Sequence, residues 1–193
     1  MTVLPLARQR SAWVLCLSLA LLACATPAPP EPADNANLLT GRLAVVIAGM
    51  EPNAATADQP AATQSLSAAF ELRGSAQAGS LDLISPLGSI MARAVWSPTG
   101  VHLQSSRGSQ RYADIASLTR DMLGESLPVE TLFDWLRGRP WAGAPSTQNA
   151  APFPEGFSQM GWRVDLSGFA QAVIVAERER APKVLLRARL DRP

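Results

Sequence analysis

Cys24 is the residue in this chain whose position most strongly suggests chemistry. It ends the run 21–24, Leu-Leu-Ala-Cys, and closes an apolar segment over residues 12–22 that is preceded by Arg8 and Arg10. A basic start, a short apolar stretch and a small residue before the cut are typical of a secretory signal peptide. The apolar stretch of 11 residues is too short to span a bilayer, which takes about 20 residues. The sequence therefore predicts cleavage just before Cys24.

The run ending at Cys24 resembles the lipobox of bacterial lipoproteins. The resemblance implies that Cys24 becomes the first residue of the mature protein and that its thiol and its amine are acylated. One acyl chain gives only marginal membrane binding, at about 0.8 kcal/mol per buried methylene, whereas three chains would hold the protein on a membrane. The alternative is a cysteine that happens to lie near an ordinary cleavage site. Ala25 follows Cys24, and the absence of an aspartate at this position implies the outer membrane of a Gram-negative cell.

Composition argues against several classes of function. Without residues 1–23 the chain has 170 residues, enough for one domain, and fifteen basic against sixteen acidic residues, so its net charge of −1 gives no sign of nucleic acid binding. The only cysteines are Cys16 and Cys24, and the only histidine is His102, which argues against disulfides and against a cysteine or histidine metal site. No Gly-x-Ser-x-Gly, Gly-x-Gly-x-x-Gly or P-loop motif occurs. We therefore expect no enzymatic activity, no metal and no cofactor.

The chain divides into three parts by composition. Residues 25–37 hold four prolines and several alanines, a composition that favours an extended spacer. We therefore expect a lipoprotein signal peptide over 1–23, an acylated cysteine with a tether over 24–37, and a folded domain over 38–193.

Residue patterns within the domain predict an α+β fold. Alternation of apolar and polar residues predicts strands over 41–47, 65–73, 80–85, 90–96, 101–105, 110–112, 162–166, 172–176 and 183–190. Helical spacing predicts one helix between Asp114 and Gly124 and a second over 129–136. Residues 49–64 and 139–156 are expected to be loops.

Two short helices are scant cover for so many antiparallel strands. A curved sheet with helices over its open side would leave an apolar hollow of the kind that binds acyl chains. Side chains that fill the space completely are the alternative, and the pattern leaves both open.

Several segments, read in order, resemble the LolB family of outer-membrane lipoprotein receptors. They are 41–43 (Gly-Arg-Leu), the strand with Phe70, 83–89 (Leu-Ile-Ser-Pro-Leu-Gly-Ser), 108–112 (Gly-Ser-Gln-Arg-Tyr), 127–128 with Leu132, 135–140 (Trp-Leu-Arg-Gly-Arg-Pro), 157–159 and 161–162. The match covers nearly all of residues 41–190. It implies a highly curved antiparallel sheet, an incomplete barrel, with helices covering its open side and enclosing an apolar cavity. It also implies that the periplasmic carrier LolA delivers lipoproteins whose acyl chains enter this cavity, and that they are then inserted into the outer membrane.

The resemblance and the alternation together indicate site residues. The family places a leucine at the tip of an exposed loop that acts in membrane insertion, and here this loop is Pro86, Leu87 and Gly88; the alternative is a Leu87 folded back onto the core. The residues expected on the cavity wall are Leu66, Phe70, Leu72, Leu81, Leu83, Leu132, Phe133, Leu136 and Leu186. Trp135 lies one position off the helix stripe, so we expect it to border the cavity or a partner surface.

The leading interpretation is therefore a lipid-anchored factor of the outer membrane, facing the periplasm. Its expected partners are LolA, lipoprotein cargo and outer-membrane phospholipid, with no nucleic acid, and we expect a monomer. A second interpretation is a non-catalytic envelope lipoprotein that binds a free lipid or another hydrophobe. A third is a hydrolase with an unrecognised serine or carboxylate site. Two departures from the family are the lack of room for an amphipathic helix before the first strand and the long loop at 49–64.

Overall fold

Antiparallel strands that form a single open sheet dominate the computed structural model, which describes residues 37–48, 63–151, 154–178 and 180–191. All of these residues fall within one of the two units into which the chain divides, residues 32–193. The eleven strands of the described part are β1 (Leu39–Ile47), β2 (Gln64–Gly74), β3 (Gly79–Ile84), β4 (Ile90–Ser97), β5 (Gly100–Ser105), β6 (Gly108–Tyr112), β7 (Ser146–Gln148), β8 (Gly156–Gln159), β9 (Trp162–Asp165), β10 (Val173–Arg178) and β11 (Val184–Leu190). The predicted signal peptide, Cys24 and the tether up to residue 36 lie outside the described residues, as does most of the predicted loop at 49–64.

The helical segments are short. They are α2 (Ile115–Leu123), η2 (Val129–Thr131), α3 (Leu132–Trp135) and η3 (Phe169–Gln171). The first three lie between β6 and β7 in sequence, and η3 lies between β9 and β10. No helix in the described ranges is long and apolar enough to cross a membrane.

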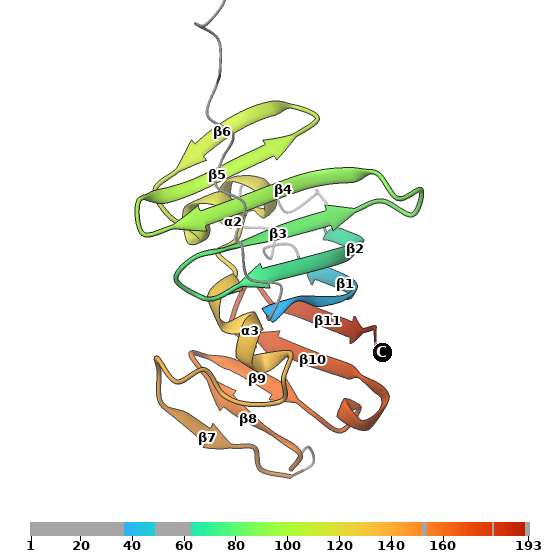
Figure 1. Cartoon of the computed structure of the whole chain (residues 1–193). Coiled ribbons are helices and arrows are strands. Elements are labelled where there is room, and N and C mark those ends of the chain that lie inside the picture. The colour runs from blue at the N-terminus through green and yellow to red at the C-terminus, as the bar shows by residue number, and fades with distance from the viewer. Residues whose placement is uncertain (1–36, 49–62, 152–153, 179, 192–193) are drawn as a thin grey trace, which may run out of the picture. The chain divides into compact units, whose positions relative to one another are not determined.

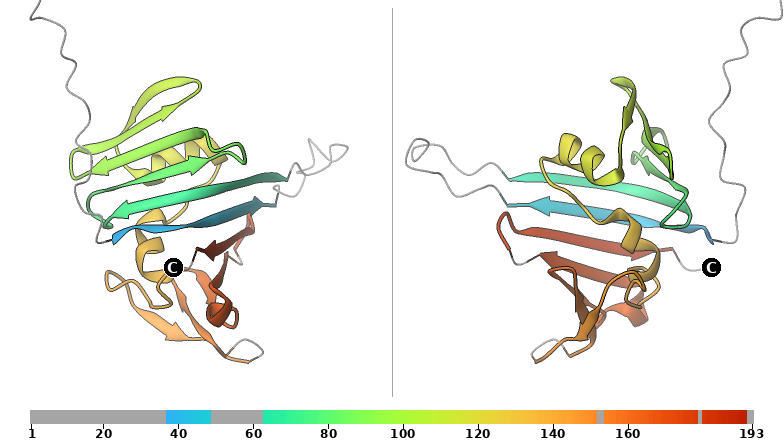
Figure 2. Two further views of the ribbon diagram at one scale, coloured as in Figure 1. Left: turned by 45° about the vertical axis from the view of Figure 1, so that its right-hand side comes forward. Right: turned by 90° about the vertical axis from the view of Figure 1, so that its left-hand side faces the viewer.

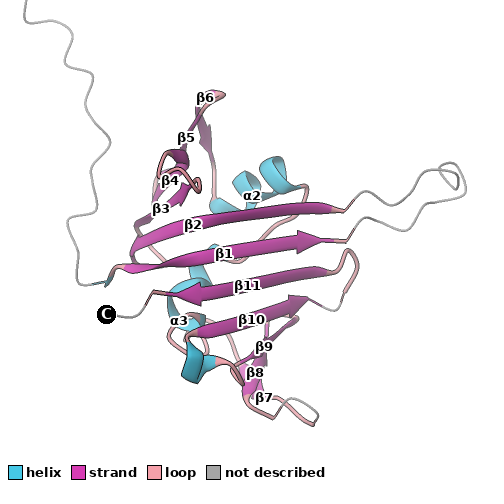
Figure 3. Cartoon of the chain, turned by 90° about the vertical axis from the view of Figure 1, so that its right-hand side faces the viewer, coloured by secondary structure: helices cyan, strands magenta, loops and turns pink. Residues whose placement is uncertain are grey.

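The sheet is built from two meanders that meet at β1. The strand order is β6-β5-β4-β3-β2-β1-β11-β10-β9-β8-β7, so the first and last strands of the chain lie side by side. Figure 1 shows how the strands change direction steadily from β6 to β7, so that the sheet is strongly twisted. The segments α2, η2 and α3 follow β6 and precede β7, and α2 and α3 lie against one face of the sheet (Figure 2, Figure 3). The predicted open, curved antiparallel sheet with helices over one side is confirmed.

Alternation decides which face of each strand is covered. In β1, Leu43, Val45 and Ile47 are buried while Arg42 and Val46 are exposed, which is the period-two pattern of a half-buried strand. Gly41 allows β1 and β11 to approach closely, because a Cβ there would lie 2.2 Å from the backbone oxygen of Arg189. The covered face continues through both meanders and contacts the helical segments.

Aromatic side chains fill the space beneath α3. Trp135 is 1% exposed and packs against Phe157 and Trp162, with ring centroids 6.4 and 6.1 Å away. Its Nε1 donates a hydrogen bond of 2.8 Å to Oε1 of Gln159. The expectation that Trp135 borders a cavity or a partner surface is therefore wrong, because its indole is enclosed by strands β8 and β9.

The predicted loop at 139–156 is also partly wrong. It contains β7 and the first residue of β8, which pair in register from Ser146 with Gln159 to Gln148 with Phe157. All three residues of β7 are exposed, so no alternation of apolar side chains marks this strand.

Candidate functional site

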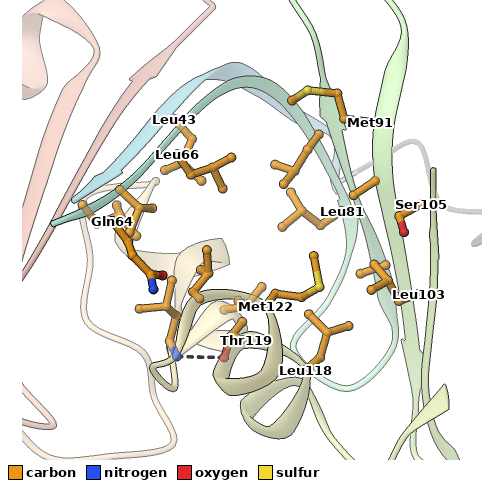
Figure 4. Close-up of a pocket in the computed structure, with 18 of the residues that line it drawn as sticks. Leu43, Gln64, Leu66, Leu81, Met91, Leu103, Ser105, Leu118, Thr119 and Met122 are labelled. Atoms are coloured by element: carbon orange, nitrogen blue, oxygen red, sulfur yellow. Dashed lines mark hydrogen bonds between the residues drawn. The ribbon is translucent and has the colours of Figure 1, made fainter. Parts of the chain in front are cut away.

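A pocket of about 530 Å³ lies between the sheet and α2. Its sheet side includes Leu43, Val45, Leu81, Leu83, Ala94 and Leu103, and its helix side includes Leu118, Met122, Leu123, Leu127, Val129 and Leu132. In Figure 4, Leu43, Leu66 and Met91 lie above the space, Leu81 and Leu103 beside it, and Met122 and Leu118 below it. The side chains at its walls are mostly aliphatic, so the pocket suits an apolar ligand.

Local sequence explains why α2 can form the floor of this pocket. Asp114 is the N-cap, and its carboxylate accepts a hydrogen bond from the backbone N–H of Ser117 at 2.7 Å. The hydroxyl of Ser117 lies 3.3 Å from the backbone N–H of Asp114, which completes a capping box. Gly124 ends the helix at φ 75°, a left-handed conformation that favours glycine. The hydrogen bonds from Ser117 hold the pKa of Asp114 below its ordinary value.

Three polar contacts hold α2 and the segment after it in place: one joins the two to each other, and two join them to the sheet. Oγ1 of Thr119 accepts a hydrogen bond of 2.9 Å from the backbone N–H of Leu127. The hydroxyl of Tyr112, in β6, donates one of 2.6 Å to Asp121, and this bond raises the pKa of Tyr112. Arg178, in β10, donates one of 2.9 Å to the carboxylate of Glu125. The cover of the pocket is thus held to both meanders of the sheet.

The residues expected on the cavity wall separate into two groups. Leu66, Leu81, Leu83, Leu132 and Leu186 line the pocket. Phe70, Leu72, Phe133 and Leu136 lie instead in the packed core, where Phe133 contacts Trp96 edge to face with centroids 6.1 Å apart. The two groups share one face of the sheet and of the helical segment but differ in position along it.

The expected loop Pro86-Leu87-Gly88 is the turn between β3 and β4. The backbone N–H of Gly88 donates a hydrogen bond of 2.9 Å to the oxygen of Ser85, and Gly88 has φ 82°. The side chain of Leu87 is 94% exposed. The turn therefore projects Leu87 into solvent and does not fold it back onto the core.

Other features relevant to chemistry are few. No group of three or more His, Cys, Asp and Glu residues in the described ranges could hold a metal ion. His102 lies between the buried residues Val101 and Leu103 on the outer face of β5, and its Nε2 accepts a hydrogen bond of 2.7 Å from Arg111. His102 therefore pairs with Arg111 on the outer face of the sheet, away from the pocket.

Sequence reasoning missed the polar side of the pocket. Gln64, Ser65, Ser105, Ser106 and Arg107 also line it, and all five lie at strand ends or in a turn. Met91 and Met122, at the pocket wall, were not assigned to it either. The helical stripe that contains Leu118 and Met122 was the available signal, because a stripe on a helix that covers a sheet must face it.

Comparison with known proteins gives consistent matches. Residues 39–189 match the model of the family described as outer membrane lipoprotein LolB. A protein of Bordetella parapertussis is 30% identical over 100% of both chains. One of Cupriavidus metallidurans is 32% identical over 81% of this chain and 77% of its own, and one of Azoarcus sp. (strain BH72) is 35% identical over 82% and 80%. Each of the three is named outer-membrane lipoprotein LolB.

Proposed function

The chain belongs to the LolB family of outer-membrane lipoproteins, and from this premise we propose that it accepts lipoproteins from the carrier LolA and inserts them into the outer membrane. Family membership places the protein at the outer membrane of a Gram-negative cell, lipid-anchored, facing the periplasm and acting in lipoprotein localisation. The proposal adds a site to this role: the acyl chains of the cargo occupy the pocket between the sheet and α2.

The pocket is the observation that carries the proposal. A methylene group takes about the volume of a water molecule, about 30 Å³, so a space of about 530 Å³ has room for at least one long acyl chain. Aliphatic walls stabilise such a chain by about 0.8 kcal/mol per buried methylene. Binding through such contacts is reversible, as transfer requires.

Cys24 and Leu87 have separate roles in the proposed transfer. Acyl chains on Cys24 keep the protein at the membrane, and mass spectrometry of the N-terminal peptide tests this role directly. An unmodified Cys24, or cleavage elsewhere, would exclude it. Leu87 acts at release, where the exposed turn enters the lipid surface.

A transfer assay with a filled pocket tests the proposal. Ala94 lines the pocket, whereas its neighbour Val95 faces the other side of β4. We expect Ala94→Trp to prevent transfer of a radiolabelled lipoprotein from LolA, because the indole occupies the space of the acyl chain. Val95→Trp, the matched control, should transfer at nearly the normal rate. If Ala94→Trp accepts cargo normally, acyl chains do not use this pocket. If the wild-type protein binds free lipid but takes no lipoprotein from LolA, the protein is a lipid-binding factor instead.

A further inference from the structure

Five polar residues of the pocket, other than Thr119 of α2, lie at one end of its walls. Gln64 and Ser65 begin β2, where they pair with Ile47 and Val46 at the end of β1. Ser105 ends β5, and Ser106 and Arg107 form the turn that leads into β6. From β5 to β2 each strand is antiparallel to the next, so the end of β5 and the start of β2 lie on the same side of the sheet. The pocket therefore has an aliphatic interior and a polar rim.

Arg107 is the one charged side chain among the described residues that line this pocket. Its side chain is exposed, and the ion pairs found within the described ranges do not include it. The backbone N–H of Arg107 donates a hydrogen bond of 3.2 Å to the hydroxyl of Ser105. This bond shapes the turn and does not involve the guanidinium. Arg107 thus presents a cation at the rim of an apolar pocket.

The turn that carries Arg107 is next to the turn that carries Leu87. Strands β4 and β5 are paired, with Ala92 opposite Ser105, so the β3–β4 and β5–β6 turns project from the same end of neighbouring hairpins (Figure 1). The first residues of β4 are also exposed and apolar: Ile90 is 52% exposed and Met91 is 37% exposed. This end of the sheet therefore presents three exposed apolar residues, Leu87, Ile90 and Met91, together with the cation of Arg107.

We infer that Arg107 binds the phosphate of a membrane phospholipid when the Leu87 turn enters the lipid surface, an inference that rests on the proposed function. The planar guanidinium matches phosphate oxygens in two parallel hydrogen bonds. A phospholipid places its phosphate just outside the apolar layer. Leu87 can therefore enter the apolar layer while the guanidinium of Arg107 contacts the phosphate. With both contacts made, the rim of the pocket faces the bilayer, and an acyl chain can leave the pocket directly into lipid.

A dye placed beside Leu87 tests this inference in the mature, lipid-anchored chain. In the proposed mature protein Cys16 is removed with the signal peptide and Cys24 is acylated, and the sequence has no other cysteine. Ser89→Cys then gives one free thiol for an environment-sensitive dye. The protein is reconstituted into vesicles of an anionic phospholipid or into vesicles of a digalactosyl lipid, which has no phosphate. We expect insertion of the dye to be about fivefold more favourable in the phospholipid, the factor that corresponds to about 1 kcal/mol for one arginine near an anionic lipid surface.

Variants then separate the inference from the function on which it rests. Arg107→Gln should erase the preference for phospholipid, and Arg107→Lys should keep part of it. Arg187→Gln, the matched control, removes an exposed arginine from β11 and should change nothing. Leu87→Glu should prevent insertion in both lipids, because it removes the apolar tip.

Two outcomes would overturn the inference. One is an Arg107→Gln protein that still prefers phospholipid; if this variant also accepts less lipoprotein from LolA, Arg107 is assigned to the cargo. The other is a wild-type protein with no preference. In each case a Leu87→Glu protein that accepts but does not deliver cargo would still support the proposed function.

Discussion

Arg178 in β10 is bonded to Glu125, 53 residues away in the sequence, in the segment that follows α2. The Nη2 of Arg178 lies 2.9 Å from Oε2 of Glu125 and donates a second bond of 2.9 Å to the backbone oxygen of Pro182. The guanidinium also lies 5.8 Å from the ring centre of Trp162. The side chains of Arg178 and Glu125 are only 9% and 25% exposed, so this contact links the cover of the pocket to the sheet in a partly dry environment.

Arg178→Met should therefore lower the free energy of unfolding by about 3 kcal/mol, since it leaves the carboxylate of Glu125 partly buried without its partner. Urea unfolding followed by tryptophan fluorescence measures this change. Arg139→Met is the matched control, because Arg139 pairs with Asp134 but its side chain is 65% exposed, and the loss there should stay below about 1 kcal/mol. Equal losses of unfolding free energy in the two variants would show that the bond to β10 stabilises the fold no more than an exposed ion pair does.

Gln159 is expected to stabilise the core beneath α3. Its Oε1 accepts hydrogen bonds from Trp135 Nε1 and from the backbone N–H of Trp141, and its Nε2 donates to the backbone oxygens of Trp141 and Ala144. Gln159→Leu leaves these buried or half-buried groups unpaired, at a cost of about 1–3 kcal/mol for each group that water cannot reach. We expect thermal unfolding to shift down markedly, while Gln148→Leu, at an exposed position in β7, should stay close to the wild type. A Gln159→Leu protein of normal stability would mean that this network contributes little.

The sequence predicts the sheet better than it predicts the pocket. The helix between Asp114 and Gly124 was expected within its actual bounds, because the N-cap and the glycine at its end are local signals. Most strands alternate apolar and polar residues, because only one face of the sheet is covered. Strand β7 was missed because Ser146, Thr147 and Gln148 are all exposed and give no such pattern.

Alternation indicates which face of the sheet a residue occupies. It does not indicate which part of that face is packed and which part borders the pocket. Leu66 and Phe70 share one face of β2, but Leu66 lines the pocket and Phe70 is in the packed core. Four residues separate them, about 13 Å along a strand, and this distance exceeds the width of the contact with a helix. The burial of Trp135 was missed for a similar reason, because its partner Gln159 lies 24 residues further on.

Phe70 and Leu83 should consequently respond differently to substitution. Phe70→Ala removes a core side chain and should cost about 3–5 kcal/mol of stability. Leu83→Ser changes the wall of an unfilled space and should weaken binding of a fluorescent acylated peptide more than it lowers stability. Equilibrium unfolding and peptide titration of both variants provide the comparison. The reverse pattern, with binding sensitive only to Phe70, would place the ligand elsewhere.

The N-cap of α2 should make part of the stability depend on pH. The folded state holds the pKa of Asp114 below its ordinary value of 3.8, so the carboxylate stabilises the fold at pH values above 3.8 and this contribution is lost as the pH falls through the folded pKa. Asn also caps helices well but does not titrate here. Asp114→Asn should therefore match the wild type near neutral pH and lose less stability between about pH 5 and pH 3. Parallel acid profiles for the two proteins would contradict this role.

Leu87→Glu should separate receipt of cargo from its delivery. Leu87 is 94% exposed at the tip of its turn, so a carboxylate there costs little in water and should leave folding and the pocket unchanged. Burial of a leucine in lipid is worth about 1.5–3 kcal/mol, and its loss should slow delivery into liposomes at least about tenfold. The measurement is a two-step assay that scores transfer from LolA and then release into vesicles. A variant that fails to accept cargo would place Leu87 at the contact with the carrier, and one that delivers at the normal rate would show that release depends on another surface.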